Sequence, residues 1–159
     1  MNGPVPSNPG VRFPPPLIFA IGMLLAYLVQ RAWPVPFLPL SLRGLALGFG
    51  WMLIAGSAAF MAWAMLTFRR ARTAIVPIRP ATALVCSGPY ARTRNPMYLG
   101  LTLVYLGTTV LLNSVWPLVL LPVVLFLLRR FVIDREERYL AGAFGSDYAE
   151  YQRRVRRWL

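Results

Sequence analysis

The chain has 159 residues, about the length of one domain, and 57% of them are hydrophobic, which is more than a soluble domain of this size normally carries. All 17 basic residues are arginines against five acidic residues, and they flank apolar runs, which favours an anionic membrane surface over nucleic acid as the partner. Histidine is absent and Cys86 is the single cysteine, so a zinc site or a Ser-His-Asp triad is strongly disfavoured and we predict no metal.

Two apolar runs come first along the chain. They cover residues 14–33 and 44–68, and the second has no charged residue, which is typical of a membrane span. The second run begins with Gly44 and Gly48, four residues apart, a spacing that permits close helix contact. We expect these glycines to pack inside the bundle; a dimer face is the alternative, which leaves a homodimer open.

A third stretch, from Asn95 to Leu128, has 34 residues without a charge. That is longer than the roughly 20 residues that one span requires and slightly short for two full spans with a loop. We therefore predict a helical hairpin that turns at "NSVWP", Asn113 to Pro117. Its two helices would be spans at 96–112 and 115–133.

The last segment, 134–159, is more polar than the rest of the chain. We predict that it is cytoplasmic, that its helix breaks near Gly145 and that the part after the break is an amphipathic interfacial helix. Its arginines would then lie toward anionic headgroups. Its apolar face would carry Tyr148, Tyr151, Val155 and Trp158.

The distribution of arginine predicts the orientation in the membrane. If both termini are cytoplasmic, fifteen arginines lie inside and two, Arg31 and Arg43, lie outside, as the positive-inside rule requires. The prediction is an all-α integral membrane protein of a bacterial inner membrane, with about four transmembrane helices and the C-terminal interfacial helix. Residues 1–13 would be a disordered cytoplasmic tail, and 14–159 a single membrane domain.

The stretch "GPYARTRNPMYLG", residues 88–100, combines turn residues, arginines and tyrosines at the start of the hairpin. Asn95 is a candidate N-cap with Pro96 at the first helical position. Such a helix N-terminus suits an anionic group, and Tyr90 and Tyr98 add aromatic faces and hydroxyls. The alternative is an ordinary interfacial belt of tyrosine and arginine, and this stretch alone does not decide between the two.

Adjacent carboxylates at Glu136 and Glu137 are the second polar feature. On a helix they point about 100° apart, so one can face inward while the other faces solvent. On spacing alone, a solvated pair that balances nearby arginines is favoured. In the hairpin, however, residues 95 and 136 lie at the same end. Together they would form a pocket for a zwitterionic, nucleoside-like ligand from the cytosol and an apolar partner from the bilayer.

Two motifs in order carry a family resemblance. "LVCSGPYARTRNPMYLG", then a hydrophobic hairpin, then "REERYLAGAFGSDYAEYQRRVRRWL" resembles the isoprenylcysteine carboxyl methyltransferases and the related phospholipid methyltransferases, over about residues 65 to 159. The resemblance implies a membrane-embedded methyltransferase with S-adenosylmethionine as cofactor, S-adenosylhomocysteine as product and a lipid or lipophilic methyl acceptor. The alternative from another class is a non-catalytic four-helix membrane scaffold or accessory protein.

The resemblance also implies roles for particular residues. Glu136 would lie near the reacting group of the acceptor with Glu137 beside it, as the catalytic pair. Asn95 stands where family members have histidine, and asparagine cannot titrate, so that position is not an obligatory acid–base group. For the acceptor's carboxylate the candidates are Arg129, Arg130 and Arg135. For the cofactor they are Thr82, Ala83, Leu84, Val85, Tyr90, Asn95, Pro96, Met97 and Tyr98.

Overall fold

The computed structural model describes residues 10, 13–71 and 83–159. This part of the chain is helical and has no strand, which confirms the predicted all-α membrane fold. The predicted tail at 1–13 lies outside the described residues apart from Gly10 and Phe13, and Thr82 lies outside them as well.

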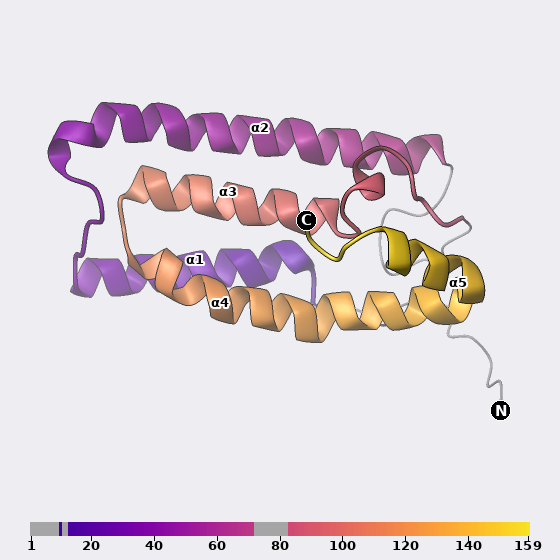
Figure 1. Ribbon diagram of the computed structural model, residues 1–159. Helices are drawn as coiled ribbons and strands as arrows, with labels where there is room; N and C mark the ends of the chain where they lie inside the picture. Colours follow the sequence, from indigo (N-terminus) through magenta and orange to yellow (C-terminus); the bar gives the residue numbers. More distant parts are fainter. Residues whose placement is uncertain (1–9, 11–12, 72–82) are drawn as a thin grey trace.

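Five helices follow one another along the described chain (Figure 1). Helix α4 continues without a break through a π-helical turn, η3, into α5. Two short 3-10 turns, η1 and η2, precede α2 and α3. The bounds are α1 Pro15–Ala32, η1 Leu40–Leu42, α2 Arg43–Arg70, η2 Gly88–Ala91, α3 Pro96–Leu112, α4 Trp116–Leu128, η3 Arg129–Ile133 and α5 Asp134–Arg154.

Three helical segments are long and apolar enough to cross a membrane. They are α1, the stretch from η1 through α2, and the continuous stretch from α4 into α5. Helix α3 is a shorter apolar helix of 17 residues. Their outward faces carry large exposed apolar side chains such as Leu24, Trp51 and Phe126, as lipid contact requires.

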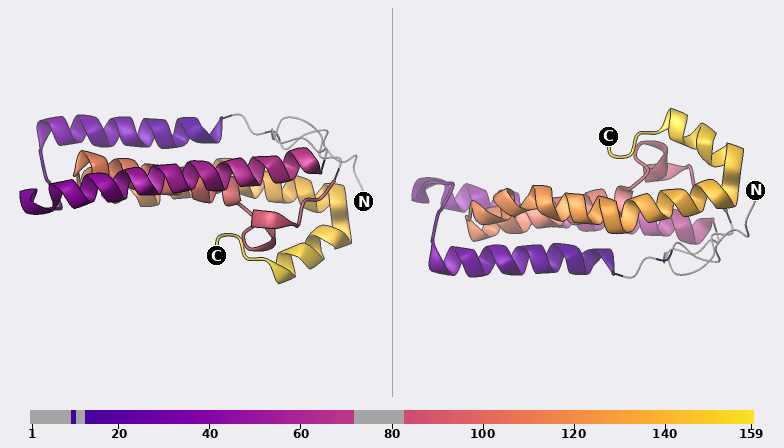
Figure 2. Two further views of the ribbon diagram at one scale, coloured as in Figure 1. Left: turned by 90° about the horizontal axis from the view of Figure 1, so that it is seen from above. Right: turned by 90° about the horizontal axis from the view of Figure 1, so that it is seen from below.

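The helices lie side by side and pack mainly in two pairs, α2 with α3 and α1 with α4, and the α3–α4 hairpin links the pairs (Figures 1 and 2). Glycines bring α2 and α3 close together. A Cβ at Gly107 would lie 2.9 Å from the carbonyl oxygen of Gly50, and one at Gly100 would overlap the side chain of Met61. This close approach brings the first turn of α3 against α2.

The expectation that Gly44 and Gly48 pack inside the bundle is wrong, because no neighbouring atom lies within 4 Å of a Cβ built at either position. The buried face of α2 instead includes Ala46, Gly50 and Ser57, which recur at helical spacing. Two residues before or after such a position, a helix has turned through roughly 200°, so both glycines face away.

The hairpin turns between Leu112 and Trp116, within the predicted region, although α4 begins one residue before Pro117. Asn113 adopts the left-handed conformation with φ of 47°, and its side chain accepts a hydrogen bond from the Leu38 N–H (2.9 Å) and donates one to the Leu38 carbonyl (3.0 Å). Trp116 Nε1 donates to the Trp33 carbonyl (2.7 Å) beside it. The α1–α2 connection is thus tied to the hairpin turn at the end of the bundle opposite Glu136.

Helix α5 bends sharply at Gly145, where φ is 50° and ψ is −118°, and this confirms the predicted break. The second part of α5 returns toward the bundle and places the C-terminus beside the start of α3 (Figure 2). The helix ends at Arg154 and Val155 is extended, so the predicted helical face does not continue to Trp158. Tyr148 and Tyr151 are buried within it.

Candidate functional site

The first turn of α3 forms one side of the candidate site. Asn95 occupies the N-cap position with Pro96 after it, but the predicted capping by the Asn95 side chain is wrong. Its Nδ2 instead donates to the carbonyl oxygen of Arg157 (2.9 Å), because the C-terminal segment lies against it. No side chain caps the start of α3, so no side-chain oxygen competes with a ligand for the first N–H groups of this helix.

Glu136 on the first turn of α5 forms the other side. The Tyr98 hydroxyl, from the first turn of α3, donates a hydrogen bond of 2.6 Å to Glu136 Oε1. Tyr98 is buried in an apolar cluster with Leu128, Val132 and Ile133. The structure therefore brings together two predicted site residues that are 38 positions apart in the sequence.

The environment of Glu136 changes its acidity. Burial raises the pKa of its carboxyl from 4.5 to about 7; the Tyr98 hydrogen bond acts in the opposite direction, and the nearby charge of Glu137 adds to the increase. Part of the Glu136 surface still reaches solvent. Near neutral pH this group can therefore hold or accept a proton, as general acid–base chemistry requires.

Tyr90 lies close to the same carboxylate. Its ring meets Phe68 edge to face, with centroids 4.8 Å apart, and its carbonyl accepts a hydrogen bond from the Tyr151 hydroxyl (2.7 Å). Burial raises the pKa of the Tyr90 phenol, with Tyr151 and then Glu136 adding to the effect. The Glu136 charge is thus near enough to act on Tyr90.

The other residues proposed for the cofactor divide between two sides. Met97 packs against the cluster of Tyr98 and also against the cluster of Val85 and Tyr90, so it joins the two. Pro96 is fully buried beside it. Leu84 packs instead against the tyrosines of α5, and Ala83 is half-buried.

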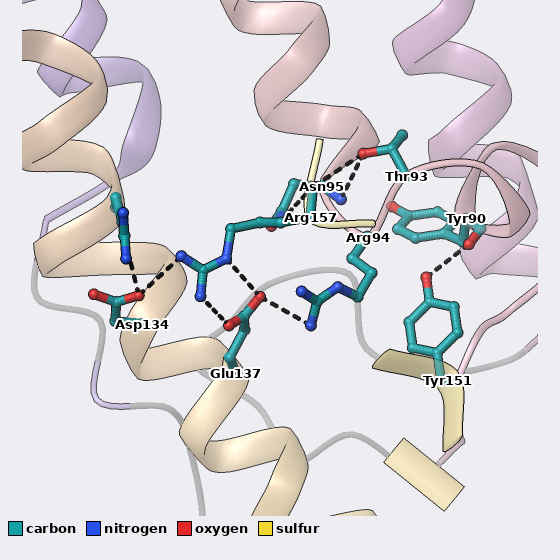
Figure 3. A network of polar contacts seen from close by, with 9 residues as sticks. Tyr90, Thr93, Arg94, Asn95, Asp134, Glu137, Tyr151 and Arg157 are labelled. Atoms are coloured by element: carbon teal, nitrogen blue, oxygen red, sulfur yellow. Dashed lines mark hydrogen bonds and ion pairs between the residues drawn. The ribbon is translucent and has the colours of Figure 1, made fainter. Parts of the chain in front are cut away.

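Glu137 has a different environment from its neighbour. Arg157 contacts it through two nitrogens, at 2.5 and 3.1 Å, and Arg94 NH1 lies 3.2 Å from Glu137 Oε1 (Figure 3). Its side chain is only 14% exposed. Two guanidinium groups fix the direction of this carboxylate, so Glu137 is suited to organise the site.

The structure buries Arg94, which lies in the stretch 88–100 for which an interfacial belt is the alternative interpretation. Its side chain is 13% exposed, and its Nε has no hydrogen-bond partner within the part of the chain that the structure describes. A buried donor of this kind is costly unless a partner binds there.

The three arginines proposed for an acceptor carboxylate lie farther out. Arg129 and Arg130 are exposed, and Arg129 approaches Asp134 at 3.9 Å. Arg135 NH1 donates to the Gly10 carbonyl (2.7 Å). Among the described residues, none of these arginines forms a hydrogen bond or an ion pair with Glu136, so the structure does not join them to the Tyr98 side of the site.

Sequence reasoning missed Arg157, which we had assigned to the lipid headgroups with the other C-terminal arginines. The ion pairs of Arg157 with Glu137 and Asp134 connect residues at least 20 positions apart. No local pattern distinguishes it from Arg153, Arg154 or Arg156. The fold alone selects it, because the kink at Gly145 returns the chain to the start of α5.

Comparison with known proteins shows the family of this chain. Residues 45–147, more than half of the chain, match the family model described as phospholipid methyltransferase. The chain belongs to the phospholipid methyltransferase family. It is therefore a membrane methyltransferase, and the alternative of a non-catalytic scaffold is not supported. Membership of the family implies the use of S-adenosylmethionine.

Named relatives of this methyltransferase agree. Protein-S-isoprenylcysteine O-methyltransferase B of Arabidopsis thaliana is 32% identical over 142 residues, which cover 86% of this chain and 71% of that protein. Protein-S-isoprenylcysteine O-methyltransferase of Schizosaccharomyces pombe is 38% identical over 72 residues, 45% of this chain and 30% of the relative. An uncharacterized protein of Haemophilus influenzae is 45% identical over 65 residues, 40% of this chain and its own full length. No solved structure matches the chain.

Proposed function

We propose that this methyltransferase moves a methyl group from S-adenosylmethionine to a lipophilic acceptor at the cytoplasmic face of a bacterial inner membrane. The observation that carries the proposal is the Tyr98–Glu136 hydrogen bond of 2.6 Å, which joins the start of α3 to the start of α5. It places a carboxylate of near-neutral pKa beside apolar side chains, where an acceptor from the bilayer and a cofactor from the cytosol can meet.

The residues around α3 fit the cofactor. The carboxylate of the cofactor could accept hydrogen bonds from the uncapped N-terminus of α3 and from the buried Arg94 Nε. Neither donor has a hydrogen-bond partner among the described side chains. Its nucleoside matches the apolar and aromatic surfaces of Met97 and Tyr90. When bound, it supplies a methyl group on a positively charged sulfonium.

The chain itself would contribute alignment and exclusion of water. Holding the acceptor in line with the methyl group supplies up to roughly 7–11 kcal/mol of the barrier reduction in ideal cases. Glu136 would orient the acceptor, and it would take up a proton if the nucleophile is an amine, thiol or phenol. The buried cluster of Tyr98 and Leu128 keeps bulk water from that side of the site.

The acceptor is proposed to be of the isoprenylcysteine kind, because two relatives carry that name. An acceptor with a free carboxylate needs a cation, and the candidates remain Arg129, Arg130 and Arg135. All three follow the apolar α4 segment, which is where a lipid-soluble substrate would present its polar end. A phospholipid amine is the other acceptor class that an acceptor screen should include.

Calorimetric titration of the detergent-solubilised protein with S-adenosylhomocysteine tests the cofactor site. We expect saturable micromolar binding that weakens at least tenfold in Tyr98→Ala. The matched control is Tyr27→Ala, which removes an exposed tyrosine of α1 and should bind as the wild type does. Absence of binding by a folded wild type would contradict the proposal.

A labelled methyl donor then identifies the acceptor. Prenylated cysteine and phospholipid amine are offered separately to the wild type and to Glu136→Gln. We expect transfer to one of them by the wild type, and a loss of at least tenfold in the variant without a matching loss of cofactor binding. Equal transfer by both proteins would remove Glu136 from the reaction.

A further inference from the structure

The chain beyond α5 lies across the candidate site. After α5 ends at Arg154, Val155 is extended, with φ of −121° and ψ of 127°. We name residues 156–158 the C-terminal strap. Its Trp158 packs against the apolar cluster that contains Tyr98, so the strap reaches the buried side of the site.

The backbone of the strap is fastened to the loop before α3. The Arg94 N–H donates to the Arg156 carbonyl (3.0 Å). The Arg157 carbonyl accepts two further hydrogen bonds, from Asn95 Nδ2 (2.9 Å) and from Thr93 Oγ1 (3.2 Å). Both Thr93 and Asn95 are buried, so these contacts are protected from competing water.

The side chain of Arg157 extends in the other direction, to α5. Its Nε and NH2 form a two-pronged contact with Glu137, at 3.1 and 2.5 Å, and its NH1 lies 3.5 Å from Asp134 Oδ1 (Figure 3). The side chain is only 26% exposed. Paired charge-assisted hydrogen bonds of this geometry restrict both partners in direction as well as in distance.

One residue therefore holds both halves of the candidate site. Its carbonyl binds the loop that leads into the first turn of α3, and its guanidinium binds the first turn of α5. Glu136 is the direct neighbour of Glu137 on that turn, and Tyr98 follows Asn95 by three residues. Among the described residues, no hydrogen bond or ion pair joins Arg157 to Glu136 or Tyr98, so its effect on them would pass through its partners.

We propose that Arg157 is a positioning residue for methyl transfer, which acts through Glu137 and Asn95 to hold the start of α3 and the start of α5 at a fixed separation. The inference rests on the proposed function, since the separation matters only if cofactor and acceptor meet between these turns. A displacement of one turn by about 1 Å would misalign an in-line transfer.

The test compares Arg157→Ala with Arg156→Ala, which removes the same charge from the exposed neighbour and leaves the backbone contacts in place. Two quantities are measured: the dissociation constant for S-adenosylhomocysteine, and amide hydrogen exchange of the segment 93–98. For Arg157→Ala we expect at least tenfold weaker binding and faster exchange. For Arg156→Ala we expect binding within twofold of the wild type and unchanged exchange.

Two further variants separate positioning from simple packing. Arg157→Lys keeps the charge and Arg157→Met keeps the length, so a role of charge predicts better binding by Lys than by Met. If Arg157→Ala does not yield folded protein, this pair carries the test alone. Equal binding by the Lys and Met variants would overturn the inference.

A double-mutant cycle with Glu137→Gln tests the route. If Arg157 acts through Glu137, the loss of binding in the double variant should be smaller than the sum of the two single losses, although Glu137→Gln also removes the Arg94 ion pair. Additive losses would overturn that route. The outcomes also distinguish the two proposals. If the wild type does not bind S-adenosylhomocysteine, the proposed function is contradicted. The comparison of hydrogen exchange then still tests whether Arg157 holds the segment 93–98 in place. If the wild type binds and the Arg157→Ala and Arg156→Ala variants have equal affinity and equal exchange, only the positioning role of Arg157 is overturned.

Discussion

Glu136 and Glu137 are adjacent in the sequence and have opposite environments. Glu136 receives a phenol hydrogen bond and is largely enclosed, while Glu137 is held between Arg94 and Arg157. One helix step of about 100° is sufficient to separate them, because the second carboxylate turns toward the C-terminal strap. This division leaves Glu136 able to change its protonation near neutral pH, while ion pairs hold the Glu137 side chain in place.

The raised pKa of Glu136 predicts a pH dependence of stability. Because the folded pKa, about 7, is above the ordinary value of 4.5, the folded state retains a proton that the unfolded state has lost between these pH values. The stabilisation is therefore fully present below pH 4.5 and is lost as pH rises through 7, by about 3 kcal/mol in total.

Unfolding of the wild type and of Glu136→Gln in detergent at pH 5 and pH 8 measures this difference. The amide resembles the protonated carboxyl in shape and charge, so we expect the variant to lose much less stability between the two pH values. Glu150→Gln, at a side chain of α5 that is 58% exposed, is the control and should keep the slope of the wild type. Parallel curves for wild type and Glu136→Gln would contradict the assignment.

At the scale of elements, the sequence predicts the hairpin and its turn because charge-free length and turn residues are local signals. Asn113 is such a signal, and so is Gly145, where α5 bends. Which face of α2 packs inward is a different matter. Gly44 and Gly48 have the spacing of a helix contact, yet α3 packs against the face of α2 that carries Gly50. The position of α3, which no local pattern encodes, determines which face is buried.

Close packing of α2 on α3 predicts a large effect at Gly107. A Cβ there would lie 2.8 Å from Ile54 Cγ1 and 2.9 Å from the Gly50 carbonyl oxygen, and the carbonyl cannot rotate away as a side chain can. We expect Gly107→Ala to lower the free energy of unfolding by about 1–3 kcal/mol, as measured by thermal or denaturant unfolding in detergent.

Gly48→Ala is the matched control, because a methyl group at that position meets open space. It should be neutral or slightly stabilising in a helix. A loss at Gly48 as large as that at Gly107 would mean that its face is covered, and would restore the dimer interface that we left open.

For the whole molecule, the site is only partly predictable from sequence. Tyr98 and Glu136 come from motifs at the two ends of a predicted hairpin, so their proximity follows from topology. Arg157 and Arg94 acquire their roles from the return of the chain after Gly145, a long-range contact that no spacing encodes. The orientation in the membrane is a property of the same scale and rests on arginine counts.

Cysteine labelling tests the orientation. In a Cys86→Ser background, Ser41→Cys and Ser87→Cys place exposed thiols at opposite ends of the bundle. If the termini are cytoplasmic, a membrane-impermeant maleimide should modify only the Ser41→Cys protein in intact bacterial cells, and both after lysis. The reverse pattern would place the candidate site outside the cytoplasm.

The pairing of early helices with late ones affects how the protein is made. The main partners of α1 and α2 are α4 and α3, which are synthesised later. When the first two helices enter the bilayer, the surfaces that will enclose them have not yet been made. Their insertion must therefore depend on their own affinity for lipid, with mean hydropathies of 1.4 and 1.7, and association into a bundle is a separate, later step. The apolar side chains of α1 and α2 thus serve membrane insertion first and packing second.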